Sequence, residues 1–312
     1  MPTLKGIHPG RDFALILKFF ECFSPDGWRK NRHFRVFPPY SFSTLSGNLM
    51  SLPTSTSKNV FWMLKALLGV AFIVELSAPH FSAAFDQATI VLAAVASVAA
   101  LNRQLPLQNV LPVAGIVALV GGVAHGLSAN PNLSLPFGPI VFNPAVGAKV
   151  LYFVPWTIPF LWIIAIFNAR GVGRLILRPW RKVKNYGYWL IGLTAVLAMV
   201  FDVALEPFAW HVKHFWFWQH TKIPITWAGT SLLNFIGWGF VTFLMMMFAT
   251  PSLIRKQPGN PSEPDLHPLF LWLGALVLFA AGSAGAGLWL AGVVDLAIGA
   301  VTTVFAVRGA KW

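Results

Sequence analysis

Long apolar stretches recur along most of the chain and limit how it can fold. Eight of them approach or reach the roughly 20 residues that a helix needs to cross a hydrocarbon core of about 30 Å. These stretches lie at 59–77, 81–101, 109–127, 147–167, 188–209, 227–249, 266–282 and 284–304. None alternates polar and apolar residues as a barrel strand does, and open strands would leave backbone groups unpaired in lipid. The sequence therefore predicts an all-α polytopic membrane bundle of eight transmembrane helices.

The last two stretches leave the number of helices open. Only the short run 282–287, made of glycine, alanine and serine, separates them. They form either a tight hairpin or one long span, which would give seven helices. Lysine and arginine favour eight, because they concentrate in alternate loops, as expected for loops that stay in the cytoplasm. We expect both chain ends in the cytoplasm, with a transmembrane domain at 59–307 and a short tail at 308–312.

Composition excludes several other classes of protein. Of the 312 residues, 56% are hydrophobic and only 11% are charged, whereas about 25% are charged in a soluble domain. The single cysteine, Cys22, has no second cysteine to pair with, which excludes an intramolecular disulfide and a cysteine-based zinc site. The net charge of +13 comes mainly from loops between apolar stretches. We therefore expect the lipid bilayer, and no nucleic acid, as a partner, while protein partners stay unknown.

The first 58 residues differ in character from the rest. They include a basic cluster of Arg29, Lys30, Arg32 and Arg35, and one short apolar run at 13–23. Two interpretations stay open. Either this is a cytoplasmic segment whose apolar run lies in the membrane interface, or Met50 is the true start of the protein.

Acidic residues inside the apolar stretches are the best candidates for function. A charged group in the hydrocarbon core costs about 2.5 to 3.5 kcal/mol on insertion scales, so it needs a partner, a water-filled cavity or a bound proton. Asp202 and Glu206 are four residues apart and share one helix face, where they could hold a proton for donation. Glu75, His125 and Asn234 fall at a similar predicted depth. We expect these five side chains to form one polar pocket.

Structural roles stay open for residues of the same kinds. A buried carboxyl group can accept hydrogen bonds from neighbouring helices, and Asp295, which lies near Gly292 and Gly299, can serve helix packing. His211 and His214 could present two imidazoles to a metal from one helix face. A single loose histidine cluster nevertheless favours an interfacial loop, so we expect no metal site.

Two further segments have more than one interpretation. The aromatic run at 215–218 is typical of a membrane surface, but it could also form a wall against a polyene or a carbocation. The run LPFGPIVF at 135–142 is too rich in proline and glycine for a helix. It is either a re-entrant or lid loop or an ordinary connection.

At these residues the chain resembles a known family of membrane proteins of carotenoid biosynthesis. The family includes the carotenoid 1',2'-hydratases that act on γ-carotene and on bacterioruberin precursors. The likeness covers most of 121–250 and rests on four motifs: PFG at 136–138, Asp202 followed by Glu206 and Pro207, WFW at 216–218, and NFIGW at 234–238. Departures are His125 in place of the family's usual acid, Phe142 in place of a tyrosine, Glu206 in place of an aspartate, and Ser231 near a usual proline.

The resemblance implies addition of water to a terminal isoprenoid double bond of a long polyene, without a cofactor. Asp202 or Glu206 would be the general acid, the other would position water together with Glu75, and Asn234 would orient the reacting groups. Residues that would contact the substrate are His125, Phe137, Gly138, Trp216, Trp218, Phe235 and Trp238. Alternatives are a transporter, a carotenoid-binding scaffold, or a polyene-modifying enzyme of another type such as a cyclase or desaturase. No inverted repeat supports a transporter.

Overall fold

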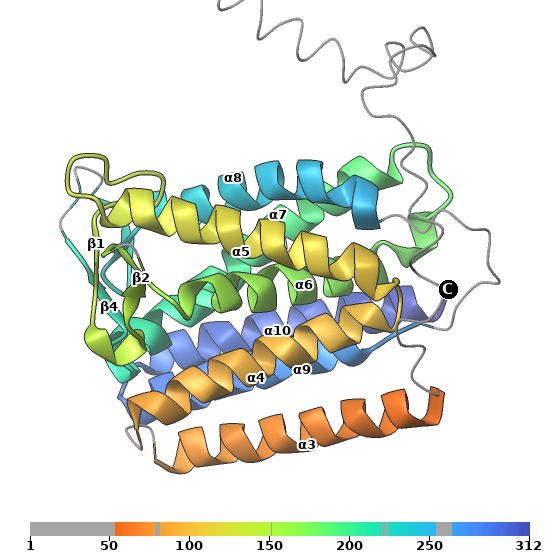
Figure 1. The fold of residues 1–312 in the computed structure, drawn as a ribbon, viewed down its shortest axis with the longest axis horizontal. Coiled ribbons are helices and arrows are strands. Elements are labelled where there is room, and N and C mark those ends of the chain that lie inside the picture. Colours follow the sequence, from red (N-terminus) through yellow and green to blue (C-terminus); the bar gives the residue numbers. More distant parts are fainter. Residues whose placement is uncertain (1–53, 79–81, 151, 220, 222–223, 254–263) are drawn as a thin grey trace, which may run out of the picture. The chain divides into compact units, whose positions relative to one another are not determined.

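The structure, a computed structural model, describes residues 54–78, 82–150, 152–219, 221, 224–253 and 264–312. The predicted basic N-terminal region and Met50 lie outside the described residues, apart from the first residues of α3. Eight long α-helices run side by side in the described part (Figure 1). They are α3 (Thr54–Ser77), α4 (Ala83–Asn102), α5 (Leu107–Ala129), α6 (Ile158–Ile176), α7 (Tyr186–Pro207), α8 (Leu232–Ala249), α9 (His267–Gly285) and α10 (Trp289–Ala310).

The predicted all-α bundle is confirmed. Among the described residues, the seven helices from α4 to α10 are long and apolar enough to cross a membrane, and α3 packs beside α4 and α9. The last two apolar stretches form a hairpin of two helices and not one long span. The chain reverses between α9 and α10, where Gly287 has a backbone φ of 82°.

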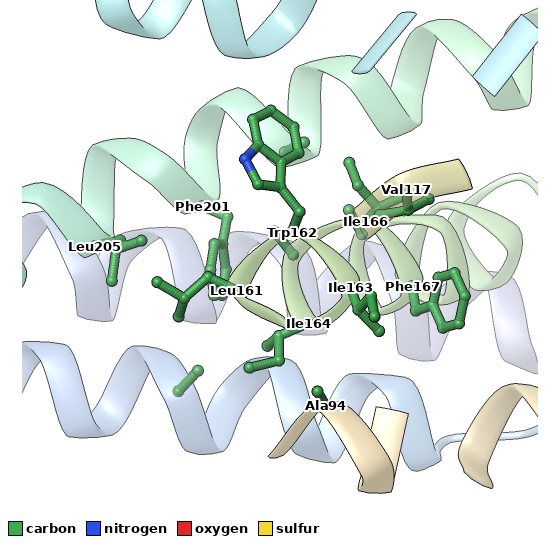
Figure 2. Packing of buried hydrophobic residues seen from close by; sticks show 14 of the residues in the cluster. Ala94, Val117, Leu161, Trp162, Ile163, Ile164, Ile166, Phe167, Phe201 and Leu205 are labelled. Atoms are coloured by element: carbon green, nitrogen blue, oxygen red, sulfur yellow. The ribbon is translucent and has the colours of Figure 1, made fainter. Parts of the chain in front are cut away.

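Helix α6 is the centre of the bundle. Some 83% of its apolar stretch is buried, against at most 56% in the other candidate spans, and it contacts α4, α5, α7, α9 and α10. Figure 2 shows why: large side chains such as Trp162, Ile164 and Phe167 leave the helix in different directions. Apolar side chains that point in several directions allow neighbouring helices to cover α6 on several sides.

Two predicted boundaries were wrong. The stretch predicted to begin at 147 becomes helical only at Ile158, because 144–155 folds into a 3-10 turn at Pro144–Val146 and a pair of strands, β2 (Lys149–Val150) and β3 (Val154–Pro155). The stretch predicted to begin at 227 becomes helical at Leu232, after a hairpin of β5 (Thr226–Trp227) and β6 (Thr230–Ser231). The segment 144–155 is largely apolar, and the short hairpin at 226–231 directly adjoins the apolar run of α8, so hydropathy alone could not place the first residue of either helix.

One glycine allows α5 and α6 to pack closely. A Cβ atom at Gly121 would lie 2.3 Å from Cγ of Trp162, whose side chain is fully buried. Trp162 in turn stacks on Trp238 of α8, with ring centroids 3.8 Å apart, so it has little room to move.

We predict that Gly121→Ala lowers the free energy of unfolding by about 1 to 3 kcal/mol, because the added methyl group overpacks this contact. The matched control is Gly115→Ala on the same helix, where a Cβ atom meets nothing within 4 Å. Thermal unfolding of the purified protein in detergent, followed by tryptophan fluorescence, measures both variants. Equal unfolding temperatures for the two would contradict the packing described for α5 and α6.

Candidate functional site

Two carboxyl groups and one amide meet where the end of α7 lies against the start of α8. Asp202, Glu206 and Asn234 are 0%, 2% and 0% exposed. Ser231 caps α8 by accepting a hydrogen bond from the backbone N–H of Leu233 at 3.3 Å, which places Asn234 in the first turn. The Nδ2 group of Asn234 donates to Oδ2 of Asp202 and, at 3.3 Å, to Oε1 of Glu206. The amide therefore joins the two carboxyl groups.

Glu206 has an unusually complete set of neutral hydrogen-bond donors. Its Oε2 atom accepts from the indole N–H of Trp216 at 3.2 Å, from the indole N–H of Trp218 at 2.7 Å, and from the hydroxyl of Thr230 at 2.8 Å. With Asn234 on the other oxygen, four groups donate to this carboxyl. Hydrogen bonds of this kind stabilise the charged form of a carboxylate.

Pro207 explains how the chain beyond Glu206 is held. A proline has no backbone N–H, so it cannot bond the carbonyl four residues earlier. That carbonyl belongs to Val203, and it accepts instead from the indole N–H of Trp227 at 3.0 Å. A π-helical turn at Phe208–Val212 follows. It leads the chain towards β4 (Trp216–Trp218), which carries two of the donors to Glu206.

Asp202 differs from Glu206 in being poorly satisfied. Among the described residues, its Oδ1 atom has no hydrogen-bond partner, and the same is true of Oδ1 of Asn234. Buried polar atoms without a partner are rare in proteins, and they commonly mark a place for water or a ligand. Within the described residues, the site therefore has two acceptor atoms without a donor, Oδ1 of Asp202 and Oδ1 of Asn234.

An aromatic cluster lies one helical turn along α8 from Asn234. Trp238, four residues later, stacks on Trp162 at an interplanar angle of 11°, and the ring of Phe137 lies 6.3 Å from Trp238, centroid to centroid. Gly237 makes the approach of Phe137 possible, because a Cβ atom there would lie 2.7 Å from the carbonyl oxygen of Pro136.

The segment 135–142 is an ordered connection that ends in a strand. Its β1 (Ile140–Phe142) pairs antiparallel with β4, with Ile140 opposite Trp218 and Phe142 opposite Trp216, at one end of the bundle (Figure 1). Gly138, with φ of 101°, approaches Trp218 and Thr221. Phe235 is buried in the first turn of α8. The predicted contact residues Phe137, Trp216, Trp218 and Trp238 therefore gather around the carboxyl pair or next to it.

The single polar pocket predicted from sequence is wrong in two of its members. His125 lies in the aromatic cluster, where its Nδ1 atom accepts from the indole N–H of Trp162 at 3.0 Å and its ring lies 4.6 Å from that of Phe137. Its other contacts are with the rings of Phe142 and Trp238 and with the Gly121 carbonyl. Within the part of the chain that the structure describes, His125 contacts no carboxyl group.

Glu75 belongs to a separate ion cluster. It pairs with Lys213, which also binds Asp86 at 2.8 Å, and the Lys213 side chain is 2% exposed. The three charged residues line an apolar cavity of about 80 Å³, together with residues such as Phe201 of α7 and Phe208 of the π-helical turn. Neither Asp202 nor Glu206 lines this cavity. Lys213 and Asp86 were not predicted from the sequence as partners of Glu75. The position of Lys213 close to an apolar stretch was a signal, because a buried acid needs a charged or hydrogen-bonding partner.

The remaining candidates lie apart from the carboxyl pair. Asp295 is fully buried on α10, and neither of its oxygens has a partner within the part of the chain that the structure describes. His211 and His214 contact backbone carbonyls, at Ala228 and Trp210. In the described ranges, no three histidine, cysteine or acidic residues group as metal ligands would.

We predict that Lys213→Met lowers the free energy of unfolding by about 3 to 5 kcal/mol, because it leaves the buried carboxylate of Glu75 and the half-buried carboxylate of Asp86 without their cation. Adding Glu75→Gln should recover part of this loss. The control is Lys149→Met, which changes an exposed lysine of β2. Thermal unfolding in detergent measures all three, and a loss that Glu75→Gln does not reduce would contradict the assignment of Glu75 to this cluster.

Comparison with known proteins identifies a family for most of the chain. A family model described as carotenoid biosynthesis protein matches residues 85–304, which include Asp202, Glu206, Asn234 and the aromatic cluster but not Glu75. No curated protein and no solved structure matches the chain. Since the family match covers most of the sequence, the chain belongs to the carotenoid biosynthesis protein family.

Proposed function

We propose that the protein is a hydratase that adds water to a terminal isoprenoid double bond of a carotenoid. The observation that carries this proposal is the joint burial of Asp202, Glu206 and Asn234 beside an aromatic cluster. Hydration of an alkene needs a proton donor, a group that activates water, and surroundings that tolerate a short-lived cation. The carboxyl pair and the indole rings supply all three. Membership of the carotenoid biosynthesis family supplies the substrate class.

The hydrogen bonds favour different roles for the two carboxyl groups. Glu206 receives four neutral donors, which suit an ionised carboxylate that accepts a proton from water. From the described residues, Asp202 receives one donor, from Asn234, and its other oxygen has no partner, which suits a protonated carboxylic acid. Two adjacent carboxyl groups in a site of low dielectric do not readily ionise together, and unlike surroundings separate them into acid and base.

The reaction then proceeds in two steps. Asp202 gives its proton to the alkene carbon whose protonation leaves a tertiary cation, and the faces of nearby aromatic rings stabilise that cation. The oxygen of a water molecule attacks the cation, and the proton that this water loses passes to Glu206. Return of the proton from Glu206 to Asp202 restores the starting state. The sum is alkene plus water to tertiary alcohol, with no net oxidation or reduction, so the proposed steps use no redox cofactor.

The bilayer delivers the substrate in this proposal, because a long polyene dissolves in lipid and not in water. Seven helices of the described part are long and apolar enough to cross a membrane, as in a multi-pass membrane protein. We further propose that the N-terminus is cytoplasmic, as the distribution of lysine and arginine favours. The carboxyl pair would then lie towards the outer leaflet.

We predict that cells making γ-carotene or lycopene gain a pigment heavier by the mass of one water when they express the protein. Asp202→Asn removes the proton donor and Glu206→Gln removes the base, so each should slow hydration by about 10²- to 10⁴-fold. Mass measurement of extracted pigments reads out the reaction.

The matched control is Glu75→Gln, which alters an acid outside the proposed site and should leave hydration in place. Folding of each variant is checked by its elution on size exclusion. Unchanged pigment from well-folded wild-type protein would contradict the hydratase proposal and favour a carotenoid-binding scaffold or a transporter. Loss of hydration in Glu75→Gln, with Asp202→Asn active, would move the reaction to the other cavity.

A further inference from the structure

A second cavity lies at the end of the bundle opposite Glu206. It has a volume of about 630 Å³ and is lined from the C-terminal ends of α4 and α6 and the N-terminal ends of α7 and α9. Since Tyr186 at the start of α7 lines this cavity and Glu206 lies at the end of the same helix, the length of α7 separates the two sites. A cavity of this volume is within the range of ligand sites in proteins.

Positive charge dominates the lining of this cavity. Four guanidinium groups contribute to it, from Arg103, Arg174, Arg178 and Arg181. Of the described residues that line it, Asp265 is the only acidic one. The cavity thus carries more positive than negative charge even with Asp265 fully ionised.

Asp265 is held in place by several neighbours. Burial opposes its ionisation, but hydrogen bonds from the backbone N–H and ring of His267 and from Gln104 lower the pKa of Asp265 below its usual value. Arg103 lies 3.8 Å from this carboxylate. Among the described residues that line the cavity, one carboxylate therefore faces four guanidinium groups.

Arg170 lies next to the cavity lining and adds a further positive charge there. It lies one turn before Arg174 on α6 and is 4% exposed. Its Nη2 group donates to the carbonyl of Leu253 at 3.0 Å, and Leu253 itself lines the cavity. Within the described residues, Nε and Nη1 of Arg170 have no hydrogen-bond partner. The N-terminal ends of α7 and α9 also favour a negative charge here.

We propose that this cavity binds the phosphate group of an anionic phospholipid. Guanidinium groups present forked donors that match phosphate oxygens, and clusters of arginine at a membrane surface recognise anionic head groups. Apolar side chains of Leu175, Leu266 and Phe270 share the lining, as a molecule with both a head group and acyl chains requires. A neutral polyene has no group that these arginines would bind, so the site is separate from the proposed reaction.

The test uses the full chain in detergent and measures binding of phosphatidylglycerol and phosphatidylcholine by native mass spectrometry. Wild-type protein should retain phosphatidylglycerol in preference. The double variant Arg174→Gln with Arg178→Gln should weaken phosphatidylglycerol binding by about tenfold or more, because the loss of charge-assisted hydrogen bonds costs at least that factor. Tm in phosphatidylcholine shows whether this variant is folded.

The matched control is Lys182→Gln with Lys184→Gln, which removes the same number of positive charges from the connection between α6 and α7, at residues that do not line the cavity. Binding there should change by less than about twofold. Equal losses in both double variants would overturn the proposal, because surface charge alone would then explain binding. Tight binding of inorganic pyrophosphate, with no preference between the two lipids, would overturn the lipid assignment in favour of a free phosphate compound.

Discussion

The site depends on one constraint: two carboxyl groups are buried next to each other in an apolar bundle, where charge is costly. The bundle meets this cost with neutral donors and not with a cation. Two indoles, a hydroxyl and an amide surround Glu206, while the nearby lysine, Lys213, is committed to Glu75 and Asp86. In the described ranges no cation pairs with Asp202 or Glu206, which favours one proton shared by the two carboxyl groups.

The loops at the end of the bundle near Glu206 position the side chains of the candidate site. The strand β1 aligns with β4 and brings the PFG segment to α8, while the β5–β6 hairpin places Thr230 over Glu206. Trp227 replaces the backbone bond that Pro207 cannot make. Motifs that are up to about a hundred residues apart in the sequence thus become neighbours. The opposite end of the bundle has a different chemistry, with guanidinium groups around a wide cavity.

Spacing alone predicted part of this arrangement. Asp202 and Glu206 share a face because they are one helical turn apart. The free-energy cost of burying their charge and the family motifs both indicated Asn234 as their neighbour. Depth did not predict Glu75 correctly, because residues at one level of a membrane can lie at different positions around the helices. The cavity at Glu75 is lined by Phe201 and Leu205 of α7 and not by Asp202 or Glu206. The start of α6 was misplaced because 147–157 is apolar although it forms strands and turns. Thr230 was missed, since a threonine in a short hairpin carries no signal until its partner is known.

Infrared spectroscopy tests most directly whether Asp202 is the protonated acid and Glu206 the ionised base. A protonated carboxylic acid has a C=O stretching band that an ionised carboxylate lacks. We predict that the purified protein at neutral pH shows such a band from Asp202. This band should disappear in Asp202→Asn and persist in Glu206→Gln. A band that disappears in Glu206→Gln and persists in Asp202→Asn would contradict the assigned roles of acid and base.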